Sequence, residues 1–141
     1  MMIVLGADHG GFIIKEAIKK YLDETNIEYI DIGSYNTESV DYPVYAKKLC
    51  SKIQDGTAEL GILCCGTGIG MSMVANKQKG IRAAVLSDEF SCEFSRKHNN
   101  ANVLCLGGRV VSNEKAMELA KLFLNTQFES GRHERRIAMF E

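Results

Sequence analysis

The stretch LGILCCGTGIG, residues 60–70, joins a short apolar run to a turn that has a glycine at every second position. Residues 60–64 have the length of a strand and are continuously apolar, which is typical of a strand covered on both faces of its sheet. A helical pattern follows at residues 71–77. This stretch therefore predicts a buried strand, a glycine-rich turn and a helix in direct succession.

The same strand–helix unit recurs along the whole chain. Further apolar runs lie at residues 3–7, 29–32, 81–86 and 103–106, and further helical runs at residues 11–24, 43–54, 88–99 and 113–125. Asp88 and Ser112 stand where N-caps are expected at the starts of two of these helices. The alternation predicts a parallel α/β sheet with helices on both faces, in one domain over residues 1–141.

The composition is that of an ordinary globular protein and argues against several classes of partner. Of the 141 residues, 45% are hydrophobic and 25% are charged, and the formal net charge is −1. This balance gives no basis for a general nucleic-acid or membrane partner. No apolar run reaches the roughly 18 residues of a membrane helix. The start, MMIVLGADHGG, lacks the pattern of a signal peptide, and we expect a cytoplasmic protein.

The cysteines are five in number and include no C-x-x-C pair. The odd count and the spacing argue against a disulfide framework, a zinc ribbon and a thioredoxin-type redox pair. In a reducing compartment a cysteine is expected to be a small buried hydrophobe. This applies to Cys50, Cys92 and Cys105, and also to Cys64, which should point away from Cys65 into the core. A strained disulfide between Cys64 and Cys65 is the alternative.

The turn at residues 65–70 is the sharpest candidate site. Its glycines expose backbone N–H groups, and such a turn at the start of a helix can bind an anion or a developing oxyanion. It is not a P-loop, because no lysine follows, and not a dinucleotide fingerprint, because the third glycine is Gly70 rather than residue 71. A tight turn without a ligand is the alternative. Cys65 favours chemistry, because oriented amides stabilise a thiolate that can act as a base or a nucleophile.

Other polar residues follow the remaining strands, and ligands of open parallel sheets bind beyond the carboxyl ends of the strands. Asp8 and His9 follow the first strand, Arg109 follows the fifth, and the helix after the fourth strand ends with His98 and Asn99. We expect all of them to converge with the glycine turn on one edge, where Asp8 and His9 could bind ligand hydroxyl groups. The alternatives are an N-cap role for Asp8 and, for His98, a histidine favoured by the helix dipole.

The final segment, residues 132–141, is basic and then apolar. Arg132 and Arg136 are four residues apart, so on a helix they share a face and could clamp a phosphate. A solvated charged face is the alternative. We expect a short helix here that packs on a partner subunit. No metal site is expected, because His9, His98 and His133, the three histidines of the chain, match no ligand spacing.

A set of short motifs runs in order over essentially the whole chain. They are Asp8-His9-Gly10-Gly11, Asp41-Tyr42-Pro43, Cys65-Gly66-Thr67-Gly68-Ile69-Gly70, Ala75-Asn76-Lys77, Gly80-Ile81-Arg82-Ala83, His98-Asn99, Gly108-Arg109-Val110-Val111 and Gly131-Arg132-His133. This set resembles the ribose-5-phosphate isomerase B family, whose relatives include allose-6-phosphate and galactose-6-phosphate isomerases. The resemblance implies a Rossmann-like three-layer α/β/α sandwich with a five-stranded parallel sheet. It also implies a homodimer, or a tetramer, that works without a metal or an organic cofactor.

The resemblance implies a role for each candidate residue. Cys65 would be the general base that takes the C2 proton of an open-chain aldose phosphate and returns it at C1. His98 would donate a proton during ring opening, with Asp8 close by and Asp41 near the same groups. The residues implied in binding the substrate and its enediolate are Asp8, His9, Gly66, Thr67, Gly68, Ile69, Gly70, Asn99, Arg109, Arg132 and Arg136. Arg109 would reach the site of a partner subunit.

The implied substrate is ribose 5-phosphate, and three alternatives stay open. One branch of the family lacks the cysteine and carries a carboxylate six residues later. Position 71 is a methionine here, so the chain groups with the cysteine-base branch. A hexose 6-phosphate (allose or galactose) could replace ribose 5-phosphate, and a non-catalytic sugar-phosphate-binding subunit is argued against by Cys65 and His98. A thiol redox protein using Cys64 and Cys65 is the third alternative.

Overall fold

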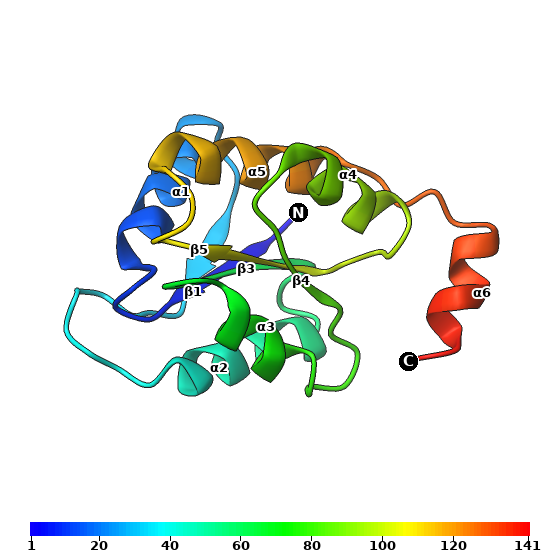
Figure 1. Cartoon of the computed structure of the whole chain (residues 1–141), viewed down its shortest axis with the longest axis horizontal. Helices are drawn as coiled ribbons and strands as arrows, with labels where there is room; N and C mark the ends of the chain where they lie inside the picture. Colours follow the sequence, from blue (N-terminus) through cyan, green and yellow to red (C-terminus); the bar gives the residue numbers. More distant parts are fainter.

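The computed structural model describes residues 1–141, and a five-stranded sheet forms its centre. All strands are parallel, in the order β2-β1-β3-β5-β4 (Figure 1). The central strands are buried over their full length, which explains their continuously apolar sequences. The predicted five-stranded parallel sheet is confirmed. Its strands are β1 (Ile3–Ala7), β2 (Tyr29–Asp31), β3 (Leu60–Cys65), β4 (Ala83–Val85) and β5 (Val103–Gly107).

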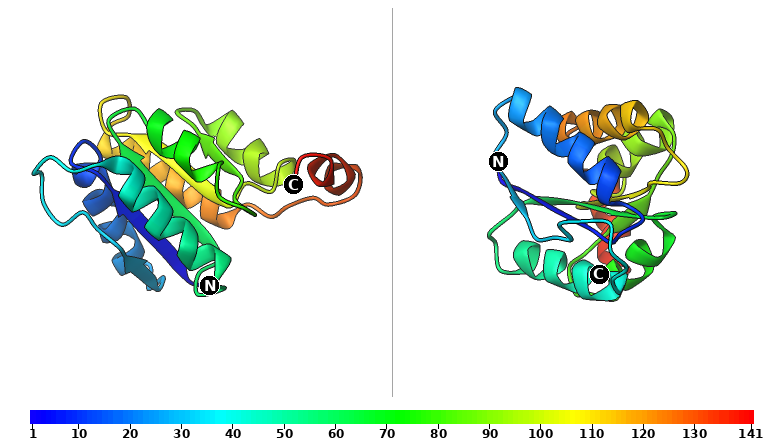
Figure 2. Two further views of the ribbon diagram at one scale, coloured as in Figure 1. Left: turned by 90° about the horizontal axis from the view of Figure 1, so that it is seen from below. Right: turned by 90° about the vertical axis from the view of Figure 1, so that its left-hand side faces the viewer.

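Helices cover both faces of the sheet, as the alternating pattern predicted (Figures 1 and 2). On one face lie α1 (Phe12–Glu24), α4 (Glu89–Lys97) and α5 (Asn113–Asn125), and on the other lie α2 (Tyr42–Gln54) and α3 (Ile69–Ala75). Asp88 and Ser112 cap α4 and α5 as predicted, accepting hydrogen bonds from the Ser91 and Lys115 amides at 2.8 and 3.1 Å. None of the helices is both long and apolar enough to cross a membrane.

Strand β3 divides its side chains between the two layers. Leu60, Ile62 and Cys64 belong to the apolar cluster under α1 and α5, whereas Leu63 and Cys65 belong to the cluster under α2 and α3. Cys64 is fully buried, so the prediction that it is a core residue is confirmed. The period of two along the strand therefore sends the sulfur atoms of these two neighbours to opposite faces.

Strand β4 is shorter than the predicted run of residues 81–86. The backbone amides at its start bond to side chains rather than to another strand. The Asn102 side chain accepts from the Arg82 amide at 2.7 Å, and the Asn76 side chain accepts from the Ala83 amide at 2.8 Å. The apolar pattern of the sequence does not reveal that asparagine side chains, rather than a neighbouring strand, bond to these amides.

The last helix, α6 (Arg132–Ala138), lies apart from both helical layers (Figures 1 and 2). The predicted short helix is therefore confirmed over these residues. Ile137 is its buried side chain, and Glu141 beyond the helix pairs with Arg82 at the start of β4. The other side chains of the helix are exposed or half-buried, including both arginines singled out in the sequence.

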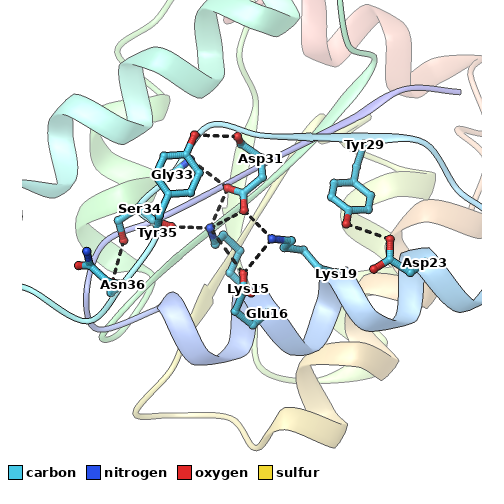
Figure 3. A network of polar contacts seen from close by, with 10 residues as sticks. All are labelled: Lys15, Glu16, Lys19, Asp23, Tyr29, Asp31, Gly33, Ser34, Tyr35 and Asn36. Atoms are coloured by element: carbon cyan, nitrogen blue, oxygen red, sulfur yellow. Dashed lines mark hydrogen bonds and ion pairs between the residues drawn. The ribbon is translucent and has the colours of Figure 1, made fainter.

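A buried ion pair fastens the end of β2 to α1 (Figure 3). Lys15 is 1% exposed and donates to both carboxylate oxygens of Asp31 at 2.7 Å and to the Ser34 carbonyl oxygen at 2.5 Å. Asp31 also accepts from Lys19 at 2.9 Å and from the Gly33 amide at 2.9 Å. Burial alone would raise the pKa of Asp31, but these hydrogen bonds outweigh it, and the pKa lies below its ordinary value.

Candidate active site

Three loops meet backbone to backbone at the carboxyl edge of the sheet. They follow β1, β3 and β5, and only glycine allows their close approach. A methyl group added to Gly11 would lie 2.2 Å from the Cys64 carbonyl, and one added to Gly108 would lie 2.3 Å from the carbonyl oxygen of Gly10. One added to Gly107 would lie 2.7 Å from the Thr67 backbone. The loops therefore form one compact platform, in agreement with the predicted convergence of the residues after these strands.

Cys65 lies at the centre of this platform. It ends β3, has 4% of its surface exposed, and its Sγ accepts a hydrogen bond from the Gly68 amide at 3.1 Å. Gly68 has φ +81, a left-handed conformation that favours glycine and starts α3 at the next residue. An amide aimed at a sulfur atom stabilises a thiolate. Because of this turn, α3 begins at Ile69, two residues earlier than predicted.

The other cysteines are free and are set up to remain thiols. Burial raises the pKa of Cys50 to about 11 and that of Cys92 to about 12. Burial also raises the pKa of Cys64 and of Cys105 above the ordinary value. With Cys64 and Cys65 on opposite faces of β3, the geometry argues against a redox pair.

Asp8 and His9 are held in fixed orientations by backbone amides. Asp8 is 7% exposed and accepts hydrogen bonds from the amides of Gly10 and Gly11 at 2.8 and 3.1 Å, so it caps the turn before α1. His9 accepts from the Val40 amide through Nδ1 at 3.2 Å. A neutral His9 therefore carries its proton on Nε2, which remains available as a donor.

Arg109 and a residue missed in the sequence complete this edge. The Arg109 amide donates to the Gly66 carbonyl oxygen at 3.0 Å, and a methyl group on Gly66 would lie 3.2 Å from the Arg109 guanidinium. Arg109 therefore lies beside the cysteine loop of its own chain, and its expected contribution to a partner's site stays a prediction. Tyr42 covers Gly70, because a methyl group there would lie 2.6 Å from the ring. The Asp41-Tyr42-Pro43 motif was the signal that could have found Tyr42.

His98 and Asn99 do not lie on this edge, and that part of the predicted convergence is wrong. Helix α4 runs back across the sheet, so its C-terminal end, His98, lies near the amino end of β5. The backbone amide of Asn102, which follows His98 closely in the sequence, donates a hydrogen bond to the Arg82 carbonyl oxygen at the start of β4. Because β5 has five residues, the two edges are separated by about 16 Å at ~3.3 Å per residue.

A second polar group forms at this amino edge, between the end of α4 and α6. The His98 and His133 rings stack with centroids 4.1 Å apart, and Glu129 Oε1 lies 3.5 Å from Nε2 of His98. Desolvation and the neighbouring charges of His98 and Arg132 lower the pKa of His133. Arg132 and Arg136 project from α6 as exposed cations. No acidic side chain forms an ion pair with Arg109, Arg132 or Arg136.

Comparison with known proteins finds likenesses over nearly the whole chain. The family model described as Ribose/Galactose Isomerase matches residues 3–140. Ribose-5-phosphate isomerase B of Escherichia coli is 45% identical over 135 residues, which cover 96% of this chain and 91% of that protein. Ribose-5-phosphate isomerase B of Clostridium thermocellum superposes with a TM-score of 0.97 at 42% identity, covering 99% and 94% of the two chains.

A further solved structure contains a bound sugar phosphate. It is ribose-5-phosphate isomerase B of Mycoplasma genitalium with bound ribulose-5-phosphate, which superposes with a TM-score of 0.94 at 38% identity. It covers 98% of this chain, and this chain covers 92% of it. The sequence motifs, the fold and these likenesses agree over the full length of the molecule, and the chain belongs to the Ribose/Galactose Isomerase family.

Proposed function

We propose that the protein is a ribose-5-phosphate isomerase that interconverts ribose 5-phosphate and ribulose 5-phosphate with Cys65 as the general base. The observation that carries this proposal is the hydrogen bond of 3.1 Å from the Gly68 amide to the buried Cys65 sulfur. It holds a reactive thiol at the edge of the sheet where ligands of α/β proteins bind. Relatives named ribose-5-phosphate isomerase B support the choice of substrate.

The geometry suggests how the proton moves. In the open-chain sugar, the Cys65 thiolate takes the proton from C2 next to the C1 carbonyl, and an enediolate forms. Backbone amides at residues 66–70 stabilise its charge, and losing one such donor typically costs a factor of roughly 10²–10³ in rate. The Thr67 hydroxyl accepts from the Ile69 amide at 3.2 Å, so its own proton is free to donate to the intermediate. Cys65 then returns the proton to C1, and the proton of the C2 hydroxyl passes to O1, so that C2 becomes the carbonyl of ribulose 5-phosphate.

A complete site requires two copies of the chain. Asp8, His9, Cys65 and Arg109 lie at the carboxyl edge, whereas His98 lies at the opposite edge, about 16 Å away over the five residues of β5. We infer a homodimer in which the partner's His98 and Asn99 open the sugar ring and bind its hydroxyls. The partner's Arg132 and Arg136 would hold the phosphate.

The separated position of α6 supports this arrangement. A helix that lies apart from the layers of its own domain can pack on a neighbouring subunit. We therefore propose that segment 132–141 packs on the partner subunit. A tetramer built from two such dimers is compatible with the same contact. The cytoplasm is the compartment that we propose, because it holds pools of phosphorylated sugars and keeps free thiols reduced.

Mixing two inactive variants tests both the activity and the sharing of the site. Cys65→Ala and His98→Asn should each abolish turnover of ribose 5-phosphate. If the chains are unfolded together and refolded, half of the dimers are mixed and each holds one intact site, so about a quarter of wild-type activity should return. If each site lay within one chain, no mixed dimer could contain an intact site. Absence of any recovery, with mixed dimers present, would therefore contradict the shared site.

Hexose 6-phosphates form the second candidate substrate class, because the matching family model is described for both ribose and galactose isomerases. Allose 6-phosphate and galactose 6-phosphate should be assayed beside ribose 5-phosphate. Turnover of a hexose phosphate alone would keep Cys65 as the base and change the substrate. No turnover of any of the three would favour a non-catalytic subunit.

A further inference from the structure

Two histidines and a carboxylate converge at the amino edge, on segments distant in the sequence. His98 ends α4, Glu129 lies in the connection before α6, and His133 lies in the first turn of α6. Each offers one ligand atom, and these atoms all lie within 4.8 Å of one another. From the spacing of the histidines in the sequence we expected no metal site. Spacing along the chain does not reveal this cluster, because its ligands come together only in the folded chain.

The distances from Glu129 to the two histidines fit a tetrahedral metal, and the stacked imidazoles must turn before both ring nitrogens face one ion. Glu129 Oε1 lies 3.5 Å from Nε2 of His98 and 3.8 Å from Nε2 of His133. Bonds of about 2.0–2.1 Å to zinc place neighbouring ligand atoms of a tetrahedron about 3.4 Å apart. Two imidazoles and a carboxylate form a ligand set that zinc uses where a fourth position stays open to water. The Glu129 side chain is 49% exposed, so water can reach that fourth position.

The three side chains are held close to one another without a metal. The Glu129 amide donates to the Lys97 carbonyl oxygen at 3.0 Å, which ties the connection before α6 to the end of α4. His98 packs edge-on against Phe94 at 4.7 Å and stacks on His133. Arg132 and Arg136 oppose a cation, so we expect reversible binding rather than a permanent structural ion.

We propose that His98, Glu129 and His133 form a site for a zinc-like divalent transition metal, and that metal bound there inhibits the enzyme by occupying the ring nitrogen of His98. The inhibition rests on the proposed isomerase function, whereas the binding does not. Magnesium should not bind, because imidazole ligands select transition metals over Mg²⁺.

Cobalt absorption measures the binding without any turnover. Co²⁺ is titrated into the Cys65→Ala protein, which removes the reactive thiol as a competing ligand. We expect the visible bands of tetrahedral cobalt with nitrogen and oxygen ligands, displaced by Zn²⁺ and unaffected by Mg²⁺. Glu129→Gln and His133→Gln should each weaken binding by roughly tenfold or more. Glu134→Gln is the matched control and should bind cobalt as the parent does. Glu134 is an exposed acid on α6, the helix that carries His133, and lies outside the cluster.

Inhibition is measured separately, on the protein with Cys65 intact. Zn²⁺ should lower the rate of the parent and of Glu134→Gln equally, and the Glu129 and His133 variants should need roughly tenfold more Zn²⁺, each compared with its own metal-free rate. No cobalt spectrum, or equal cobalt binding in Glu129→Gln with its fold intact by circular dichroism, would overturn the site. Zinc inhibition that is unchanged in both variants would assign the inhibition to Cys65 and overturn the role of His98 in it.

Discussion

Replacing Lys15 with methionine tests the buried ion pair that fastens the end of β2 to α1. The Lys15 ammonium lies 2.7 Å from both carboxylate oxygens of Asp31, and the side chain is 1% exposed. It also donates to the Ser34 carbonyl oxygen at 2.5 Å. Methionine keeps a side chain of similar length but removes the charge and these hydrogen bonds (Figure 3).

The expected cost is about 3 kcal/mol in the free energy of unfolding. Removing one partner of a buried ion pair costs roughly 3–5 kcal/mol. The lower end applies because Asp31 keeps hydrogen bonds from Lys19 and from the Gly33 amide, both at 2.9 Å. Lys19→Met is the matched control. The Lys19 side chain is 25% exposed, so its loss should cost below about 1 kcal/mol.

Urea unfolding of the wild type and both variants measures these costs. The midpoint should fall clearly in Lys15→Met and little in Lys19→Met, with unchanged dependence on urea concentration. Because the pKa of Asp31 is lower in the folded state, its contribution is present above the unfolded-state pKa and lost as the pH falls through the folded-state value. The wild type should therefore lose more stability than Lys15→Met below about pH 4. Equal costs for the two lysine variants would refute this reasoning.

Three further predictions concern the site and the platform beneath it. Arg136→Ala should raise KM for the sugar phosphate and change kcat little, whereas Arg135→Ala, an exposed neighbour on α6, should leave KM unchanged; steady-state kinetics of both variants decide this. Gly11→Ala should destabilise the protein by more than ~3 kcal/mol, since its methyl group would meet the Cys64 carbonyl at 2.2 Å. Gly6→Ala is the control and should cost less in thermal unfolding, because its methyl group would meet only the side-chain ends of Ile32 and Leu63. Iodoacetamide at neutral pH should alkylate Cys65 alone, as mass spectrometry of peptides can show, because burial raises the pKa of the other cysteines; equal labelling of Cys50 would contradict that selectivity.

Periodicity and turn chemistry were sufficient to predict the layers of the fold. The continuously apolar runs correspond to the buried strands β1, β3 and β5, and the two predicted caps of α4 and α5 are present. The opposite directions of Cys64 and Cys65 follow from the period of two along a strand. These features depend on neighbouring residues, and the sequence contains that information directly.

The missed features depend on residues far apart in the chain. The prediction that His98 lies at the carboxyl edge of the sheet was wrong. His98 is at the far end of the helix that follows β4, and such a helix returns to the opposite edge of the sheet. The pairing of Lys15 with Asp31 joins residues from α1 and β2, and nothing in the amphipathic pattern of α1 marks this lysine as buried. The meeting of Glu129 with two histidines likewise needs the path of the chain around α6.

Proton NMR of ribose 5-phosphate in D₂O with the purified protein, without added metal or cofactor, beside the Cys65→Ala variant, decides whether Cys65 is the base of an isomerase. We expect ribulose 5-phosphate that carries solvent deuterium at C1, because a base that shuttles a proton through an enediolate exchanges it with solvent. We also expect no turnover by the variant, while binding of the sugar phosphate persists. Turnover retained in Cys65→Ala, or no ribulose 5-phosphate from the wild type, would contradict the central claim.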